Sequence, residues 1–251
     1  MAVPSLERTP RFAELDSSRI VDTIARLERR ITARFPGSGL ALVCHELREL
    51  AGGTQQHIEG LSSPIWPLRA LAAIGAAAIA AIAIGLIVIA GRGLFAARGF
   101  VELVQGSESA VNQVLLLAMA VFFLVSMETR VKRHRALAAL HRLRSVVHIV
   151  DMHQLTKDPE MTQATATTPA SPARPHTPFE LGRYLDYCSE LFSLTSKVAA
   201  LYGQSLKDPV VLDAVSDIET LSASLSNKVW QKIIVLKSSV SGLQSSVQPG
   251  L

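Results

Sequence analysis

The side chains best suited to proton or metal chemistry lie in one stretch of the chain. His134, His141 and His148 follow one another at intervals of seven residues, and Asp151 comes three residues after His148. Seven residues are nearly two turns of an α-helix, so the three imidazoles share one side of it. Imidazole titrates near neutral pH and is a common metal ligand. The pattern therefore fits a proton-sensing stripe or a metal site.

Distance argues against one ion bound by all three histidines. Residues seven apart are separated by about 10 Å along a helix axis. Only His148 and Asp151 are near enough to share a ligand shell, and other ligands would have to come from another helix. We therefore favour a polar flank beside an apolar seam, and predict no bound metal and no cofactor.

A second polar set stands at the start of an apolar run. Glu108 and Asn112 are four residues apart, and in a ring of subunits they would form a carboxylate collar above a ring of amides, which attracts cations. Gln113 and Ser126 are the other polar candidates for the lining of such a pore. The alternative, which we favour, is an ordinary helix start at which the helix dipole stabilises Glu108.

Two apolar runs dominate the middle of the chain. Residues 70–90 contain no charged side chain, and 21 residues at about 1.5 Å each span about 30 Å, the thickness of a hydrocarbon core. Residues 111–127 form a second, shorter run. The sequence therefore predicts transmembrane helices over 68–90 and 109–128, joined by an outer loop over 91–108.

The charges around the second run set the expected orientation. Basic residues follow it closely, whereas the loop between the runs balances two arginines against two glutamates; the basic residues are Arg130, Lys132, Arg133 and Arg135. Such a cluster marks the cytoplasmic side of a membrane segment. We expect a multi-pass protein of the inner (plasma) membrane with both termini in the cytoplasm. The net charge of +4 then needs no nucleic-acid partner, because the basic cluster lies beside a membrane segment and no aromatic residues are interleaved with it.

Small residues recur every four positions in the first run. Ala73, Ala77, Ala81 and Gly85 form a stripe on which another helix can approach closely. The stripe predicts a packing face for the second transmembrane helix or for another subunit. With the lipid bilayer as the first partner, we expect a homo-oligomer.

The remaining segments have the period of amphipathic helices, so the chain is predicted to be all-α. Its coiled-coil-like bundle of amphipathic helices would flank the transmembrane hairpin. Five parts follow in order: N-terminal cytoplasmic helices over 1–63, the hairpin over 64–129, a juxtamembrane helix over 130–158, a linker rich in Pro, Thr and Ala over 159–177, and a C-terminal helical hairpin over 178–251.

Proline, glycine and capping residues set the expected helix ends. A helix over 40–51 is predicted to stop at Gly52 and Gly53. Thr177-Pro178-Phe179-Glu180 has the form of a capping box, and Asp208-Pro209 repeats the combination of cap and proline. The two C-terminal helices would form an antiparallel hairpin, packed on the juxtamembrane helix, on the N-terminal helices or on another subunit.

The first N-terminal helix is rich in arginine, and two interpretations remain open. A basic amphipathic helix could lie on anionic lipid. Pairing with another helix is the alternative, which we favour because Asp22 and Glu28 interrupt the basic face.

No motif of an enzyme is present in the sequence. It contains no GxSxG, no HExxH, no P-loop and no GxGxxG between a strand and a helix. Cys44 and Cys188 are expected to be reduced thiols of the cytoplasm. We predict a non-enzymatic oligomeric membrane scaffold that presents cytoplasmic helices, with a cytoplasmic protein as a further partner. The alternative function is an oligomeric cation-conducting pore lined by the second transmembrane helix.

One stretch resembles a known family. Residues 148–160, HIVDMHQLTKDPE, are similar to a signature of uncharacterised bacterial two-span membrane proteins, and residues 184–191 with Asp208-Pro209 belong to the same resemblance. It covers roughly 130–240. The resemblance implies a bacterial inner-membrane setting and adds no activity.

Overall fold

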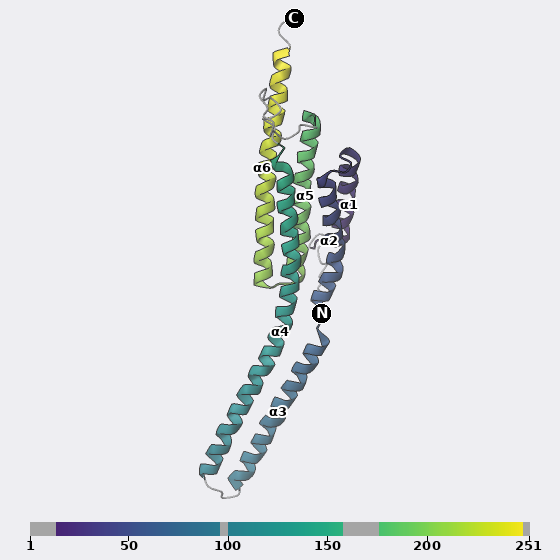
Figure 1. The fold of residues 1–251 in the computed structure, drawn as a ribbon. Helices are drawn as coiled ribbons and strands as arrows, with labels where there is room; N and C mark the ends of the chain where they lie inside the picture. The colour runs from purple at the N-terminus through teal and green to yellow at the C-terminus, as the bar shows by residue number, and fades with distance from the viewer. Residues whose placement is uncertain (1–13, 96–99, 158–175, 248–251) are drawn as a thin grey trace, which may run out of the picture. The chain divides into compact units, whose positions relative to one another are not determined.

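The computed structural model describes residues 14–95, 100–157 and 176–247, and this part of the chain is all-helical (Figure 1). The chain divides into two compact units: a hairpin unit, Ser63–Arg135, and a bundle unit made of Met1–Ser62 and Ala136–Leu251. The described residues form six helices: α1 Ser17–Arg34, α2 Gly39–Ser62, α3 Trp66–Phe95, α4 Phe100–Leu155, α5 Pro178–Ser205 and α6 Pro209–Val247. The predicted fold class is therefore confirmed as all-α.

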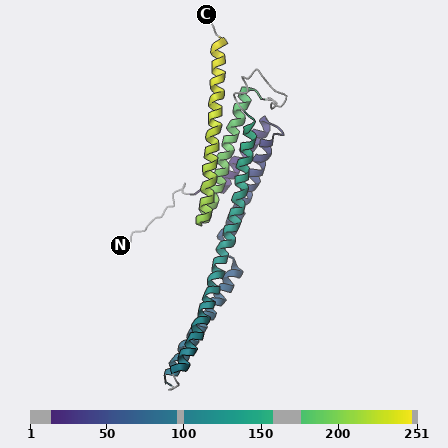
Figure 2. The ribbon, with the colours of Figure 1, turned by 60° about the vertical axis from the view of Figure 1, so that its left-hand side comes forward.

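The bundle unit has one continuous apolar core. Helices α1, α2, α5 and α6 and the last part of α4 all bury side chains in it, and α5 and α6 lie side by side (Figures 1 and 2). The apolar faces expected from the helical period are buried, and their residues are Ile20, Ile24, Leu27 and Ile31 in α1, Leu140, Leu143, Val147 and Val150 in α4, and Val211, Val215, Ile218, Leu225, Val229, Ile233 and Leu236 in α6. The C-terminal hairpin thus covers its apolar stripes with the N-terminal helices and α4.

Side-chain caps begin three of the bundle helices. Asp16 accepts hydrogen bonds from the backbone N–H groups of Ser18 and Arg19 at the start of α1. Thr177 and Glu180 form the predicted capping box of α5. Asp208 accepts from the N–H groups at the start of α6, as its sequence predicts. Each cap satisfies N–H groups that have no partner within their helix.

Two predicted boundaries are wrong. Helix α2 continues through Gly52 and Gly53 to Ser62, because Ala51 and Thr54 are buried and packing offsets the low helix propensity of glycine. Helix α3 extends to Phe95 and α4 begins at Phe100, so helix fills most of the predicted outer loop. The second apolar run and the juxtamembrane segment are one helix, α4. The α5–α6 connection is only 206–208. Most of the predicted linker, 158–175, lies outside the described residues.

The hairpin unit contains two helices long and apolar enough to cross a membrane. The candidate spans lie within Trp66–Gly85 of α3 and Val114–Leu155 of α4, both with a mean hydropathy of 2.0. Only 6% of the apolar window in α3 and 0% of that in α4 is buried. A core helix of a soluble protein would be mostly covered by its own chain, so these two helices differ from that class.

Ser222 is a polar residue within the apolar seam of α6. Its hydroxyl is buried and has no hydrogen-bond partner in the described structure. A buried hydroxyl without a partner costs about 1–3 kcal/mol. We expect Ser222→Ala to raise the free energy of unfolding by about 1 kcal/mol, measured by urea denaturation of the full chain in mild detergent. Ser226→Ala is the matched control and should lower it, since Ser226 Oγ lies 2.7 Å from Ser189 Oγ.

Candidate functional site

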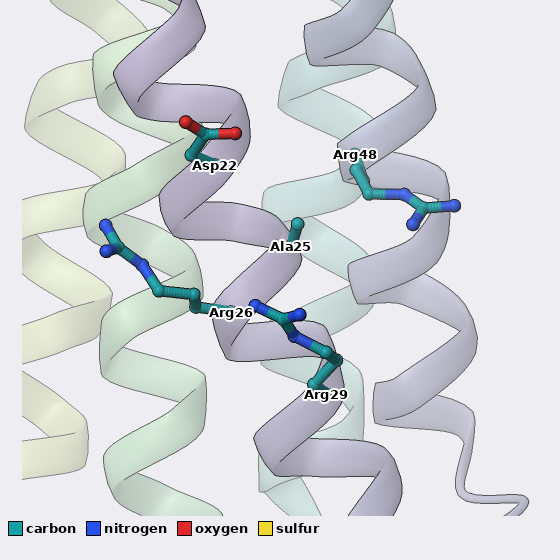
Figure 3. A pocket seen from close by; sticks show the side chains of 5 residues that line it. All are labelled: Asp22, Ala25, Arg26, Arg29 and Arg48. Carbon is teal, nitrogen blue, oxygen red and sulfur yellow. The ribbon is translucent and has the colours of Figure 1, made fainter.

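An arginine-lined hollow lies on the outer face of α1 and α2. Arg26, Arg29, Asp22 and Ala25 come from α1 and Arg48 comes from α2, around a volume of about 410 Å³ (Figure 3). We call these five residues the arginine hollow. It is open to solvent, so a ligand could reach it without any movement of the backbone.

The helical period of α1 places these residues together. Its apolar face, at Ile20, Ile24 and Leu27, is buried in the bundle core. Positions 22, 25, 26 and 29 consequently fall outside that face. The short side chain of Ala25 leaves space between the longer ones, and α2 adds Arg48 because it packs beside α1.

A charged network fixes Arg48. Its Nε lies 3.2 Å from Glu28 Oε2, while Glu28 Oε1 lies 2.8 Å from His45 Nδ1. The Glu28 side chain is largely buried between the two helices. Glu28, which in the sequence only interrupts a basic face, therefore joins α1 to α2. This pairing could not be recognised from the residue pattern, because the partners are about twenty residues apart.

The two cysteines are unsuited to nucleophilic chemistry. Both are buried and free. Burial, helped by the nearby Glu28 carboxylate, raises the pKa of Cys44 to about 12, and burial raises the pKa of Cys188 to about 12. Both thiols are protonated at neutral pH, and a thiol is a far weaker nucleophile than a thiolate.

An aromatic cluster joins α1 to α5 at the ends of the undescribed segment 158–175. Phe35 packs edge-on against His176 and Tyr184, with ring centroids 5.2 and 5.4 Å away. His176 stacks on Tyr184 at 5.8 Å, and Lys157 Nζ lies 5.4 Å from the centre of the same ring. The residues on either side of the undescribed segment thus meet at Tyr184.

The cluster makes stability depend on pH. Burial, and then the nearby Lys157 charge, lower the pKa of His176 from 6.5, while Glu180 acts in the opposite direction. Since the folded protein binds this proton less readily than the unfolded chain, the contribution to stability is complete above pH 6.5 and is lost as the pH falls below it. We expect the thermal midpoint to fall more between pH 7.5 and 5.5 in the natural chain than in His176→Phe. Parallel falls would contradict this role.

The predicted histidine stripe is on the surface. His134, His141 and His148 are exposed, and Asp151 Oδ1 accepts a hydrogen bond from Gln154 Nε2 at 2.6 Å. Nowhere in the described ranges do three or more His, Cys, Asp or Glu side chains come together in a group that could hold a metal. The structure thus brings no further ligand of these types to His148 and Asp151.

The predicted pore residues all lie on α4. Asn112 is exposed and Ser126 is half-buried. The side chains of Glu108 and Gln113 fall outside the described part of the structure. The collar of Glu108 and Asn112 therefore remains a prediction. The helix start that we favoured at Glu108 is wrong, because α4 already begins at Phe100.

The close contact between α3 and α4 is made at a glycine outside the predicted small-residue stripe. A Cβ on Gly75 would lie 2.8 Å from Val121 Cγ2, whereas a Cβ on Gly85 would have no neighbour within 4 Å. Ala73, Ala77 and Ala81 are exposed. Packing of this stripe on another subunit therefore remains a prediction.

Gly75 gives a test of the hairpin packing. We expect Gly75→Ala to destabilise the α3–α4 contact by about 1–3 kcal/mol, because Val121 is stiff and must move. Gly85→Ala should leave the contact unchanged, since the added methyl group meets open space. The proximity of the two helices can be measured by cysteine cross-linking across α3 and α4 as the detergent is made harsher. Equal cross-linking of both variants would contradict the close approach.

An ion-pair cluster joins the start of α3 to α4. Glu128 Oε1 lies 2.9 Å from Lys132 Nζ, and Glu128 Oε2 lies 3.2 Å from Arg69 Nε. The backbone N–H of Ile65 also points to Glu128 Oε1, at 3.4 Å. Trp66, next in the chain, is 75% exposed. Charged and aromatic groups thus gather at one end of the apolar hairpin. Glu128 is the one acidic residue among the basic residues that follow the second apolar run, and this feature of the sequence could have indicated the cluster.

Comparisons with known proteins give no relative for the chain. No family model matches it, and neither a curated protein nor a solved structure matches it.

Proposed function

We propose that this protein is a membrane-anchored, non-enzymatic scaffold. Helix α3 and the first part of α4 lie in the inner membrane, and the bundle unit is held on the cytoplasmic side, where it assembles with further copies or binds a protein partner. One observation carries the proposal. The apolar windows of α3 and α4 are almost uncovered by the chain itself, whereas the bundle unit covers its own seams.

The extent of the exposed apolar surface on the hairpin unit favours burial of that surface in a lipid bilayer. Soluble monomers rarely expose contiguous apolar patches above a few hundred Å². Large apolar side chains are exposed along both helices of the hairpin unit: Leu71, Ile74, Ile84, Val88, Val111, Leu115, Leu116, Met119, Phe122 and Phe123. A bilayer would remove this surface from water, and helices satisfy their backbone hydrogen bonds within lipid.

The ends of the hairpin support the orientation. Trp66 is amphipathic and suits the level of the lipid headgroups. Arg130 and Arg135 are exposed just beyond the second apolar run, and basic residues are retained on the cytoplasmic side.

The bundle unit offers a surface for protein contacts. Trp230 and Ile234 are four residues apart on α6, and they are 51% and 61% exposed. Aromatic and aliphatic side chains of this kind are typical anchors of protein interfaces. A second copy of the chain or a cytoplasmic protein could cover them.

The membrane part of the proposal can be tested in cells. The full chain should stay with the membrane fraction after carbonate washing and leave it only with detergent. A C-terminal tag should be digested by protease in inverted membrane vesicles and protected in intact spheroplasts. A chain released by carbonate, or a tag digested in spheroplasts, would refute the proposed topology.

The assembly part needs a separate measurement. Native mass spectrometry of the detergent-purified chain should show a defined oligomer. Trp230→Ala combined with Ile234→Ala should shift that oligomer toward monomer if α6 forms the contact. A purely monomeric natural chain would exclude the homo-oligomer.

One observation favours the alternative function of a cation-conducting pore. Asn112 presents an exposed amide beside the exposed apolar side chains of Leu115 and Leu116 on α4, and an amide ring could line a pore between subunits. Replacing Glu108 and Asn112 together by alanine should then abolish conductance in a planar bilayer while the oligomer persists. A natural chain without conductance would remove the pore from consideration.

A further inference from the structure

We propose that the arginine hollow binds a phosphate-bearing anion. Three arginines, Arg26, Arg29 and Arg48, line it from two different helices, and Figure 3 shows the Arg26 and Arg48 side chains extending in opposite directions from it. Each guanidinium is a planar fork of N–H donors that fits two oxygens of a phosphate group at once. Ala25 keeps the centre clear of side-chain bulk.

The donors of the hollow are only partly used within the chain. Arg26 Nη2 donates to Thr23 Oγ1 at 3.0 Å, while Arg48 uses Nε for Glu28 and its Nη2 lies 3.4 Å from His45 Nδ1. The structure shows no hydrogen bond or ion pair of Arg29 with any described residue. Each of the three arginines therefore still has guanidinium N–H groups that can donate to a ligand.

Glu28 acts as a positioning residue for the hollow. It holds the Arg48 guanidinium through Oε2 and is itself held by His45 through Oε1. The negative charge of Glu28 is therefore paired with Arg48 and His45 at the α1–α2 contact. Because Glu28 already restrains the Arg48 side chain, Arg48 loses less conformational entropy on binding an anion than an unrestrained arginine would.

The charges that border the hollow favour an anion. Three arginines outweigh Asp22, the one carboxylate among the five lining residues. A phosphate dianion at the hollow would be attracted by these positive charges. Asp22 should oppose the same anion. Removing the charge of Arg29 should therefore weaken anion binding, whereas removing the charge of Asp22 should strengthen it.

The phosphate has two chemical sources. The hollow is open to solvent and has a volume of about 410 Å³, which admits a small soluble phosphate compound or the headgroup of an anionic phospholipid. Both would present the same phosphate oxygens to the arginines, so the experiment must separate them.

The first arm uses pyrophosphate as the probe. The full chain in a neutral detergent is titrated by isothermal calorimetry, with chloride of equal ionic strength as the blank. We expect a dissociation constant on the order of 1 mM, weakened about tenfold by Arg29→Gln, because one charge-assisted contact is lost. Asp22→Asn should tighten binding. Arg142→Gln, which removes an exposed arginine of α4 outside the hollow, should leave it unchanged.

The second arm uses lipid as the probe. The purified chain is mixed with phosphatidylglycerol or phosphatidylcholine in neutral detergent micelles, and retained lipid is counted by native mass spectrometry. Preference for phosphatidylglycerol that is reduced by Arg29→Gln and kept in Arg142→Gln would assign the hollow to a lipid headgroup. Pyrophosphate binding with the same dependence, without that lipid preference, would assign it to a soluble phosphate.

Two results would overturn the proposal. One is the absence of binding in both arms. The other is binding that Arg29→Gln and Arg142→Gln weaken equally, since that reports overall charge alone. Circular dichroism of each variant would show that the bundle is still folded, because Arg29 is exposed and adds nothing to the core.

Discussion

Replacing Phe192 by alanine is expected to lower the free energy of unfolding by about 3–5 kcal/mol. Phe192 is 0% exposed and is among the largest fully buried side chains of the bundle core. Removing its ring loses the burial of an aromatic side chain and leaves a cavity that the surrounding helices fill only in part. The loss can be measured by urea denaturation of the full chain in mild detergent, followed by circular dichroism.

The same helix provides a matched control. Phe179 is 67% exposed, and the Arg34 guanidinium lies 5.5 Å from the centre of its ring. An exposed cation–π contact is worth about 0.5–1 kcal/mol, so Phe179→Ala should cost no more than this. Similar losses for the two variants would mean that α5 does not bury the face that the structure shows.

Introducing lysine at Ala78 is expected to have the second largest effect. Ala78 lies near the middle of α3 and is exposed in the hairpin unit. In the proposed membrane setting it faces lipid, where a central lysine costs about 2.5–3.5 kcal/mol of insertion free energy. Ala78→Lys should therefore reduce the fraction of chain inserted, measured by the fraction that resists carbonate extraction.

Position along the helix provides the control for this variant. Leu71 is also exposed but lies close to the start of α3. A lysine there can extend its ammonium group to the headgroup region, so Leu71→Lys should remain inserted. If both variants insert as well as the natural chain, α3 is not surrounded by lipid.

The seams of the bundle could be predicted because they depend on periodicity alone. Ile24 and Ile31 are spaced by two turns, and any partner helix must cover such a stripe. The capping box at Thr177 is likewise a local signal that the structure retains. Neither prediction required knowledge of which helices pack together.

The helix boundaries that failed depend on tertiary packing. Gly52 and Gly53 have low helix propensity, but residues on both sides of them are buried in the core and continue the helix. Propensity differences of about 1 kcal/mol per glycine are small beside the burial of several apolar side chains. A local rule therefore ended α2 eleven residues too early.

The arginine hollow could not be predicted for a related reason. Arg26 and Arg29 can be placed on one face of α1 from their spacing, but Arg48 joins them only through the register of α2 on α1. Glu28 and Arg48 form an ion pair between the two helices, and no periodic pattern in the sequence relates their two positions. The close approach at Gly75 depends in the same way on how α3 meets α4.

The meeting of Lys157 and His176 at Tyr184 has a consequence for how the protein could be divided. Lys157 and His176, which border the segment 158–175, both contact the Tyr184 ring, and lengthening a connection between two such fixed points costs little free energy. Foreign sequence inserted between these borders should leave the bundle intact. Two polypeptides, 1–157 and 176–251, should likewise assemble into the folded bundle when they are produced together. The second polypeptide then provides α5 and α6.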